Sequence, residues 1–328
     1  MPYASSINSA GQLLRTLIFG EAKVRKSSWA CMAAEAGFNV VLLDGDDGSQ
    51  VVRQLPPKVQ EKVLVVDVRD LIDRAVFKEF LAVFVRAKAN FYWNEQERKA
   101  DYRTFNPESS YIKFNPSLLT QNDVLILDSW KAFTKSTLLA YVLANDLDLS
   151  DAEKEEWPGY SYQSLFQDFV LKSMHCLKCH VIVIGHETVY EKWDRRNKKE
   201  PKLLSRKTQI VSSSGPHAKT VMTEFTDILY VERLGPSTFT INTGGDTDRI
   251  GGSRLIEPRV FQYDALPVTA LLEKIGAKST GEPCHGAQWF SSGKELSEIK
   301  QNSPTPVITN TGSRVEGGSI LSRLQAKG

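Results

Sequence analysis

The sequence has little cysteine, no strong excess of either charge and no long apolar run. Only 4 of its 328 residues are cysteine, which favours a reducing compartment over a disulfide-stabilised secreted protein. The net charge is +2, so total charge does not by itself indicate a nucleic-acid partner. No apolar stretch reaches the roughly 18 residues that cross a membrane, and residues 1–9 lack the pattern of a secretory signal. We therefore expect a cytoplasmic protein with no membrane partner.

Two of the cysteines lie in the segment Cys176-Leu177-Lys178-Cys179-His180, which matches the pattern for c-type haem attachment. This segment ends a predicted helix and leads directly into an apolar strand. No second Cys/His pair follows at zinc-finger spacing. We therefore interpret the two thiols as structural.

Short apolar runs predict strands that are buried on both faces of a sheet. They are Leu17–Phe19, Val40–Leu43, Val63–Val66, Val124–Leu127 and Val181–Ile184. The helical stretches between them are Ser28–Ala36, Leu71–Ala89, Trp130–Ala144 and Tyr162–Leu177. This alternation predicts an α/β doubly wound core with a mostly parallel sheet, in which ligands bind at the carboxyl ends of the strands.

The rest of the chain suggests how this core is bounded. Three later segments predict a more antiparallel edge of the sheet: Asp227–Glu232, Thr238–Asn242 and Arg259–Tyr263. Residues 91–122 are polar and aromatic with little periodicity, which predicts an insertion or a long loop. From about residue 276 the chain is rich in Gly, Ser, Thr and Pro. We expect a core at residues 1–275 and a flexible tail at residues 276–328.

A phosphate-binding loop is predicted directly after the first strand. The pattern for such a loop is G-x-x-x-x-G-K-[ST], and Arg25 stands here where the second glycine is expected. In this interpretation Lys26 reaches the β- and γ-phosphates of ATP and Ser27 holds Mg²⁺. The residues expected to surround the nucleotide are Gly20, Glu21, Ala22, Lys23, Val24, Arg25, Lys26, Ser27 and Ser28.

Polar residues at three other strand ends complete the predicted site. The strand at residues 124–127 ends in Asp128, which is the arrangement of an aspartate that holds Mg²⁺. The second strand leads into Asp44-Gly45-Asp46, and Asp46 is the favoured acid to orient the attacking water. His186 follows the strand at 181–184, where it could sense the γ-phosphate. Each feature also has a structural alternative: an ordinary acidic strand end, a polar turn and a structural histidine.

A basic stretch with interleaved aromatic residues follows His186 and continues to Lys207. Basic side chains track a phosphate backbone and aromatic rings stack on bases, so the stretch predicts contact with single-stranded DNA. The alternative is a solvated charged loop. The residues proposed to contact nucleic acid are Lys192, Trp193, Arg195, Arg196, Lys198 and Lys199.

Taken in this order, the motifs resemble the RecA-type ATPase core, and in particular phage-encoded RecA-like ATPases that include single-strand-annealing proteins. The resemblance covers about residues 14–265. It depends on the loop at 20–27, the strand ending at Asp46, Leu125-Ile126-Leu127-Asp128-Ser129, and Val183-Ile184-Gly185-His186-Glu187. Ser214-Gly215-Pro216-His217-Ala218-Lys219 before Phe225-Thr226-Asp227-Ile228 also looks like that group.

The resemblance implies a RecA-like fold and an ATP- and Mg²⁺-dependent protein that acts on single-stranded DNA in phage recombination or replication, within the host cytoplasm. It places Asp46 where the family carries a catalytic glutamate, one methylene longer. It also implies a ring or filament of identical subunits, with a neighbour's Lys219, Arg249 or Arg254 completing the site. A single-strand-binding protein is a further candidate partner. A helicase or helicase loader, and a nucleotide-binding scaffold with little hydrolysis, remain as alternatives.

Overall fold

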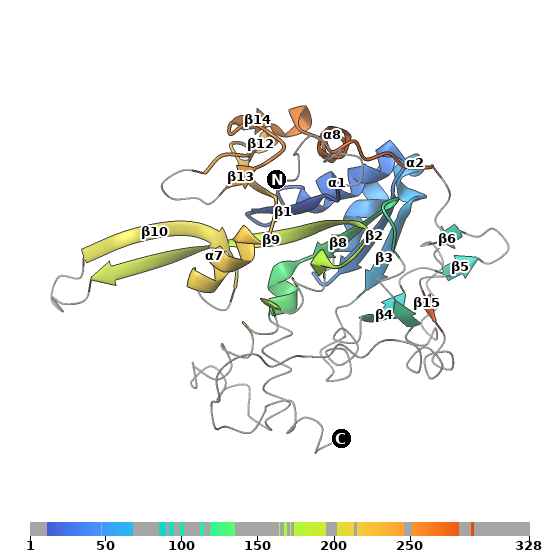
Figure 1. Cartoon of the computed structure of the whole chain (residues 1–328), viewed down its shortest axis with the longest axis horizontal. Coiled ribbons are helices and arrows are strands. Elements are labelled where there is room, and N and C mark those ends of the chain that lie inside the picture. The colour runs from blue at the N-terminus through green and yellow to red at the C-terminus, as the bar shows by residue number, and fades with distance from the viewer. Residues whose placement is uncertain are drawn as a thin grey trace, which may run out of the picture.

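A mixed sheet forms the centre of the fold (Figure 1). The structure is a computed structural model. It describes residues 12–46, 48–67, 85–89, 92–94, 99–101, 112–114, 119–134, 174–194, 202–212, 215–245, 251–281 and 290–291, with positions 164, 167, 168 and 171. The described strands form one 13-stranded sheet and a separate pair.

The central strands of this sheet are all parallel. In spatial order they are β11 (Asp227–Arg233), β1 (Arg15–Gly20), β9 (His180–Asp194), β8 (Asp123–Asp128), β2 (Asn39–Asp44) and β3 (Val63–Asp67). Runs of Val, Ile and Leu in these strands suit positions that are covered on both faces. Their carboxyl ends lie at one edge, so the predicted α/β fold with a mostly parallel sheet is confirmed.

Antiparallel strands extend the sheet on both sides, whereas the sequence predicted only one antiparallel edge. On one side β12 (Phe239–Asn242) and β13 (Gly252–Ser253) pair with β11, and β14 (Val260–Gln262) pairs with β12. Beyond β3 lie β4 (Val85–Ala89), β7 (Ile112–Phe114) and β15 (Phe290–Ser291). The predicted antiparallel edge is therefore correct for β12 and β14, and β11 joins it to the parallel core, because β11 pairs antiparallel with β12 and parallel with β1.

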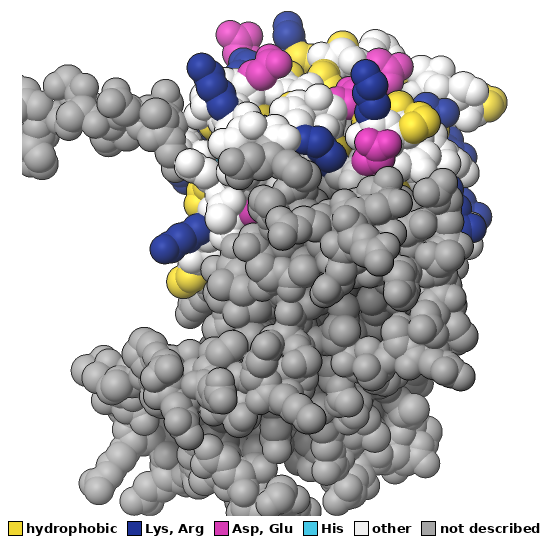
Figure 2. Space-filling model, turned by 90° about the vertical axis from the view of Figure 1, so that its right-hand side faces the viewer, with side chains coloured by type: hydrophobic (Ala, Val, Ile, Leu, Met, Phe, Trp, Pro, Cys, Tyr) yellow, Lys and Arg dark blue, Asp and Glu magenta, His cyan; other side chains and the backbone are white. Residues whose placement is uncertain are grey.

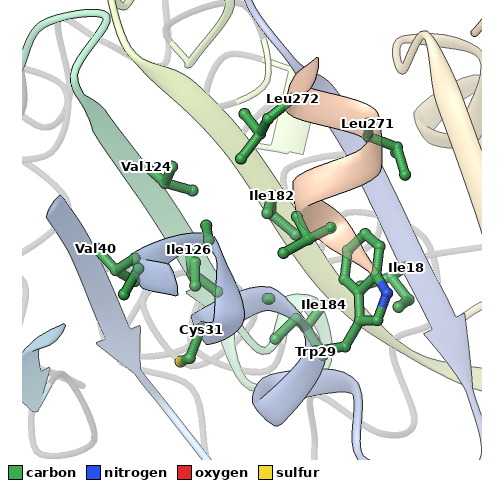
Figure 3. Packing of buried hydrophobic residues seen from close by; sticks show 14 of the residues in the cluster. Ile18, Trp29, Cys31, Val40, Val124, Ile126, Ile182, Ile184, Leu271 and Leu272 are labelled. Atoms are coloured by element: carbon green, nitrogen blue, oxygen red, sulfur yellow. The ribbon is translucent and has the colours of Figure 1, made fainter. Parts of the chain in front are cut away.

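Helices cover both faces of the sheet. One face packs against α1 (Lys26–Cys31), the 3-10 helices η2 (Met32–Ala36) and η3 (Gly48–Gln54), α2 (Pro57–Gln60) and α8 (Val268–Lys274). Trp29 of α1 and Leu271 of α8 lie close to the β1 and β9 residues Ile18 and Ile182 in this core (Figure 3). The opposite face packs against Leu171, Met174 and α7 (Gly215–Thr223). Alternate residues of each strand thus enter two separate cores, as expected for a doubly wound sheet.

Three predictions of local structure need correction. The helix predicted at Leu71–Ala89 is wrong at its end, because Val85–Ala89 is strand β4, paired with β3 and β7. Residues 91–122 were predicted as an insertion or a long loop, and the long-loop alternative is wrong, because the segment contains β5 (Tyr92–Asn94), β6 (Lys99–Asp101) and β7. The first predicted helix is divided into α1 and the 3-10 helix η2. Residues 135–163, which include most of the helix predicted at 130–144, lie outside the described residues, and so does most of the predicted tail, although Phe290 and Ser291 pair with β7.

Strand β9 continues well past the edge of the sheet and pairs with β10 (Lys202–Ile210). The two strands project away from the rest of the described chain as a long hairpin (Figure 1). Here we call residues 187–210 the arm; residues 195–201 lie outside the described part. The basic stretch, for which a solvated charged loop was the alternative to DNA contact, begins and ends in strands.

Candidate functional site

The loop between β1 and α1 has the backbone form of a phosphate-binding loop. Gly20 ends β1 with φ of 150°, and a Cβ at this position would lie 2.1 Å from the carbonyl oxygen of Val231. Only glycine fits this close approach of β11. Lys23 and Arg25 both have φ of 62°, in the left-handed region. The backbone at Arg25 therefore takes a conformation that glycine adopts easily, although the residue is arginine.

Lys26 begins α1 and points back over this loop. Its ammonium group is buried and donates hydrogen bonds to the carbonyl oxygens of Gly20, at 3.2 Å, and of Glu21. Burial lowers the pKa of Lys26 to about 8, while the nearby carboxylates of Asp128 and Glu187 oppose this change. A phosphate group beside the ammonium would favour the charged form in the same way as these carboxylates.

Ser27 and Asp128 meet where the α1 N-terminus faces the end of β8. The hydroxyl of Ser27 donates to Oδ2 of Asp128 at 2.5 Å. Burial raises the pKa of Asp128 to about 6, and Asp44 and Asp46 add to this effect, whereas the hydrogen bond from Ser27 and the charge of Lys26 oppose it. Three carboxylates therefore lie near one another at this edge of the sheet, since Asp44 pairs in register with Asp128.

The predicted water-orienting acid and the predicted sensor contact each other directly. Nε2 of His186 lies 2.9 Å from Oδ2 of Asp46, and because the carboxylate can only accept, this nitrogen carries the hydrogen. The hydroxyl of Ser129 donates to the same oxygen. The hydrogen bond from His186 is the main cause that lowers the pKa of Asp46, and partial burial opposes it. Asp46 therefore stays ionised at neutral pH, fixed by residues from β9 and from the end of β8.

These residues line one pocket of about 850 Å³. On its phosphate side lie residues 22–28, Asp46, Asp128 and His186. Its other walls come from η2, η3 and the C-terminal segment, and include Glu35, Val51, Gln54, Leu55, Tyr263, Asp264, Pro267 and Val268. A volume of this size lies within the range of small-molecule and cofactor pockets, about 300–1,000 Å³. The structure thus brings Lys26, Ser27, Asp46, Asp128 and His186 together, as the sequence predicts.

Several residues of this site carried no predicted role. Ser129 fixes Asp46, and Asp44 adds negative charge beside Asp128. Both stand next to predicted residues in the sequence, at the ends of strands, which is a signal that could have identified them. Tyr263 and Arg233 contact the phosphate loop from more than 200 positions away along the chain, where no local pattern indicates them.

Two of the six predicted nucleic-acid residues lie in the described part of the arm, and neither lines the pocket. Lys192 and Trp193 belong to β9, opposite Ser205 and Leu203 of β10, and their side chains are outside the described part. Arg195, Arg196, Lys198 and Lys199 lie wholly outside the described residues. On the described part of the arm, Arg206 and Lys207 are exposed, and so are the apolar side chains of Val189, Leu203 and Leu204.

Polar contacts hold the base of the arm to the core. The hydroxyl of Tyr190 donates to the carbonyl oxygen of Ser212 at 3.2 Å and accepts from its amide at 3.1 Å. The hydroxyl of Ser212 lies 2.8 Å from Nδ1 of His217, whose Nε2 lies 3.0 Å from Asp168. Strand β9 therefore loses its pairing with β1 directly after His186. Four residues later, Tyr190 fixes the strand through its hydrogen bonds to Ser212.

Figure 2 shows the face that lies on the opposite side of the molecule from the arm in Figure 1. On the described part of the face in Figure 2, Lys and Arg side chains are interspersed with Asp and Glu side chains. A surface of mixed sign gives no extended positive potential for a phosphate backbone. Among the described residues, no helix is both long enough and apolar enough to cross a membrane.

Comparison with known protein families gives one match. The family model described as "AAA domain" matches residues 13–252, which is more than half of the 328 residues and includes the phosphate loop, Asp46, Asp128, His186 and the arm. Comparison with curated proteins gives no significant match.

Proposed function

The chain belongs to the AAA domain family, a family of P-loop ATPases, and on this basis we propose that it binds ATP with Mg²⁺ in the pocket and hydrolyses it. The observation that carries the proposal is the convergence of Lys26, Ser27, Asp128 and the Asp46–His186 pair on one pocket. Four strand ends that are distant in sequence supply these groups. They match what phosphoryl transfer requires: positioning, charge neutralisation and an oriented nucleophile.

Each side chain has a defined task in this proposal. Lys26 binds the β- and γ-phosphates and stabilises the charge that develops on the transferred group. Asp46 accepts the proton of a water molecule whose oxygen attacks the γ-phosphorus, while the bond to the ADP oxygen breaks and ADP leaves. His186 and Ser129 hold Asp46 in position. Because His186 belongs to β9, it would transmit a change at the γ-phosphate to that strand.

The metal requirement fits the oxygen donors at the end of β8. Mg²⁺ prefers carboxylate, hydroxyl and phosphate oxygens, and Ser27 and Asp128 present two such groups side by side. Burial is the main cause of the raised pKa of Asp128, and the negative charges of Asp44 and Asp46 add to it; a divalent cation would offset these charges. When bound, Mg²⁺ would supply charge neutralisation between the β- and γ-phosphates.

Steady-state hydrolysis with the matched variant Lys26→Ala tests this proposal. The wild-type protein should release phosphate from ATP only with Mg²⁺, and Lys26→Ala should lose at least about 100-fold in kcat/KM. Nucleotide binding without turnover by the wild-type protein would refute hydrolysis and favour the scaffold alternative. Failure of the wild-type protein to bind ATP would refute the proposal as a whole.

We further propose that the arm binds single-stranded DNA and that the nucleotide state alters this binding, in a recombination or replication process. The exposed Arg206 and Lys207 and the direct continuation of β9 from His186 into the arm support this role. The assignment to phage recombination, and a ring or filament in which Lys219, Arg249 or Arg254 acts on a neighbour's site, follow from the resemblance alone. Lys219 and Arg254 are exposed, and Arg249 lies outside the described residues.

Binding of a labelled oligonucleotide with ATP, with ADP and without nucleotide tests the second proposal. Affinity should differ between nucleotide states and fall as salt rises, because phosphate contacts release counterions. Equal affinity in all three states would refute the coupling, and no binding at low salt would refute the DNA role. Strand separation driven by ATP would favour a helicase, whereas pairing of complementary strands would favour annealing.

A further inference from the structure

The phosphate loop keeps two residues other than glycine in the left-handed region. Lys23 and Arg25 both have φ of 62°, and ψ of Arg25 is 19°. The Cβ of an L-amino acid is crowded in this conformation, so side chains other than glycine adopt it rarely and only when surrounding structure holds them there. Contacts from elsewhere in the chain can add to the local hydrogen bonds that Lys26 and Trp29 make to the loop carbonyl groups.

Two hydrogen bonds from the C-terminal half of the described chain reach these two residues. The hydroxyl of Tyr263, in η5 (Tyr263–Ala265), donates to the carbonyl oxygen of Arg25 at 2.7 Å. Nη2 of Arg233, at the end of β11, donates to the carbonyl oxygen of Lys23 at 2.8 Å. Both residues in the left-handed region are thus fixed at their carbonyl groups.

One aromatic ring joins these contacts. The guanidinium carbon of Arg25 lies 5.1 Å from the ring centroid of Phe239 in β12, and that of Arg233 lies 5.4 Å from it. Guanidinium groups at such distances are attracted to the ring. The ring of Tyr263 lies 6.1 Å from that of Phe239, which is itself buried. Phe239 therefore contacts the side chains of Arg25, Arg233 and Tyr263.

We infer that Phe239, Arg233 and Tyr263 form a clamp that holds the phosphate loop in its nucleotide-binding shape and replaces the missing second glycine through the side chain of Arg25. This inference rests on the proposed nucleotide binding. The three clamp residues are positioning residues, because they act on the loop and not on the nucleotide itself. Arg25 is then the residue through which the antiparallel strand β12 controls the loop, a contact that glycine at this position could not make.

Nucleotide affinity in a double-mutant cycle tests the clamp. The proteins are wild type, Phe239→Leu, Arg25→Gly and the double variant, and the probe is fluorescent N-methylanthraniloyl-ADP with Mg²⁺. Phe239→Leu keeps an apolar side chain but removes the aromatic face, and should weaken binding about fivefold to tenfold. Arg25→Gly also removes a side chain that lines the pocket, so the affinity of this variant serves only as the reference for the second background. In the Arg25→Gly protein, Phe239→Leu should change affinity by less than about twofold.

Phe261→Leu is the matched control for loss of an aromatic ring. The ring of Phe261, on the neighbouring strand β14, lies 4.2 Å from the guanidinium carbon of Arg259, and neither residue lines the pocket. This variant should bind the probe as wild type does. The clamp is refuted if Phe239→Leu leaves affinity unchanged in the wild-type protein, or weakens it equally in both backgrounds.

Amide hydrogen exchange of the nucleotide-free protein separates failure of the clamp from failure of the proposed function. Phe239→Leu should speed exchange in peptides that cover residues 20–27 by about fivefold to tenfold, and Phe261→Leu should not. In the Arg25→Gly protein the same change should have little effect on these peptides. If the wild-type protein binds no nucleotide, the proposed function fails, and this exchange pattern still supports or refutes the clamp.

Discussion

Replacing Asp46 with asparagine should abolish most ATP hydrolysis while leaving nucleotide binding intact. Asparagine keeps the size of the side chain but cannot accept a proton from water. A positioned general base contributes roughly 10²–10⁴-fold to a rate, and its strength falls as its pKa falls. His186 and Ser129 lower the pKa of Asp46, which places this carboxylate at the lower end of that range. We therefore expect kcat to fall about 100-fold, equivalent to about 2.7 kcal/mol of activation free energy.

The affinity for Mg²⁺-ADP should change less than threefold or so in the same variant, because the carboxylate of Asp46 is hydrogen-bonded to His186 and Ser129 and not to the phosphate loop. Phosphate release at saturating ATP, combined with equilibrium binding of ADP, measures both quantities. Glu61→Gln, at an exposed position after α2, removes one negative charge far from the pocket and serves as control. A kcat of Asp46→Asn within about threefold of wild type would show that Asp46 does not prepare the water.

Three further outcomes are expected. Ser27→Ala should raise the Mg²⁺ concentration needed for half-maximal hydrolysis about tenfold, and an unchanged requirement in a Mg²⁺ titration would contradict this role. Without Mg²⁺ and nucleotide, Asp128→Asn should be more stable than wild type by up to about 3 kcal/mol above about pH 6, and this gain should vanish below about pH 4. Between about pH 4 and pH 6 the unfolded wild-type protein binds fewer protons than the folded one, because the pKa of Asp128 is raised in the folded state. The wild-type protein therefore loses stability as pH rises, and the asparagine variant does not. Denaturant unfolding of both proteins above about pH 6 and below about pH 4 measures this difference. Arg206→Glu with Lys207→Glu should weaken oligonucleotide binding at least about tenfold and Lys58→Glu should not, which a fluorescence anisotropy titration with equal affinities would contradict.

The parallel core could be predicted from the sequence because its signals are local. Each central strand is a run of Val, Ile and Leu whose burial on both faces leaves no alternation, and β1, β2 and β8 lie within one residue or two of the predicted bounds. Val85–Ala89 shows the limit of such signals. Its sequence, Val-Arg-Ala-Lys-Ala, suits a helix by propensity, yet the segment is a strand because β3 and β7 offer hydrogen-bonding partners on both sides.

The sequence predicted the residues of the phosphate site better than it predicted the structure of the basic stretch. Lys26, Ser27, Asp46, Asp128 and His186 each follow a buried strand, and parallel strands place their carboxyl ends at one edge, so proximity follows from topology. The composition of the arm does not indicate its secondary structure, because charged residues such as Lys192 and Arg206 are typical of a solvated loop. In the structure Glu191 and Arg206 face each other across two paired strands, with an ion pair at 3.7 Å. The arm is formed of strands because β9 pairs with β10, and local composition does not encode such a pairing.

Arg25 illustrates how a departure from a motif can be compensated by contacts that the motif does not contain. The pattern specifies glycine because the backbone there must reach positive φ, and the structure keeps that φ with arginine in place. The stabilising groups come from β11, β12 and η5, between positions 233 and 263, where neither charge nor hydropathy indicates a link to the loop. Sequence reasoning can therefore identify which backbone conformation a site requires. Whether another residue type can supply it depends on tertiary contacts, and here a hydrogen bond to the carbonyl of Arg25 and an aromatic ring beside its guanidinium group meet that requirement.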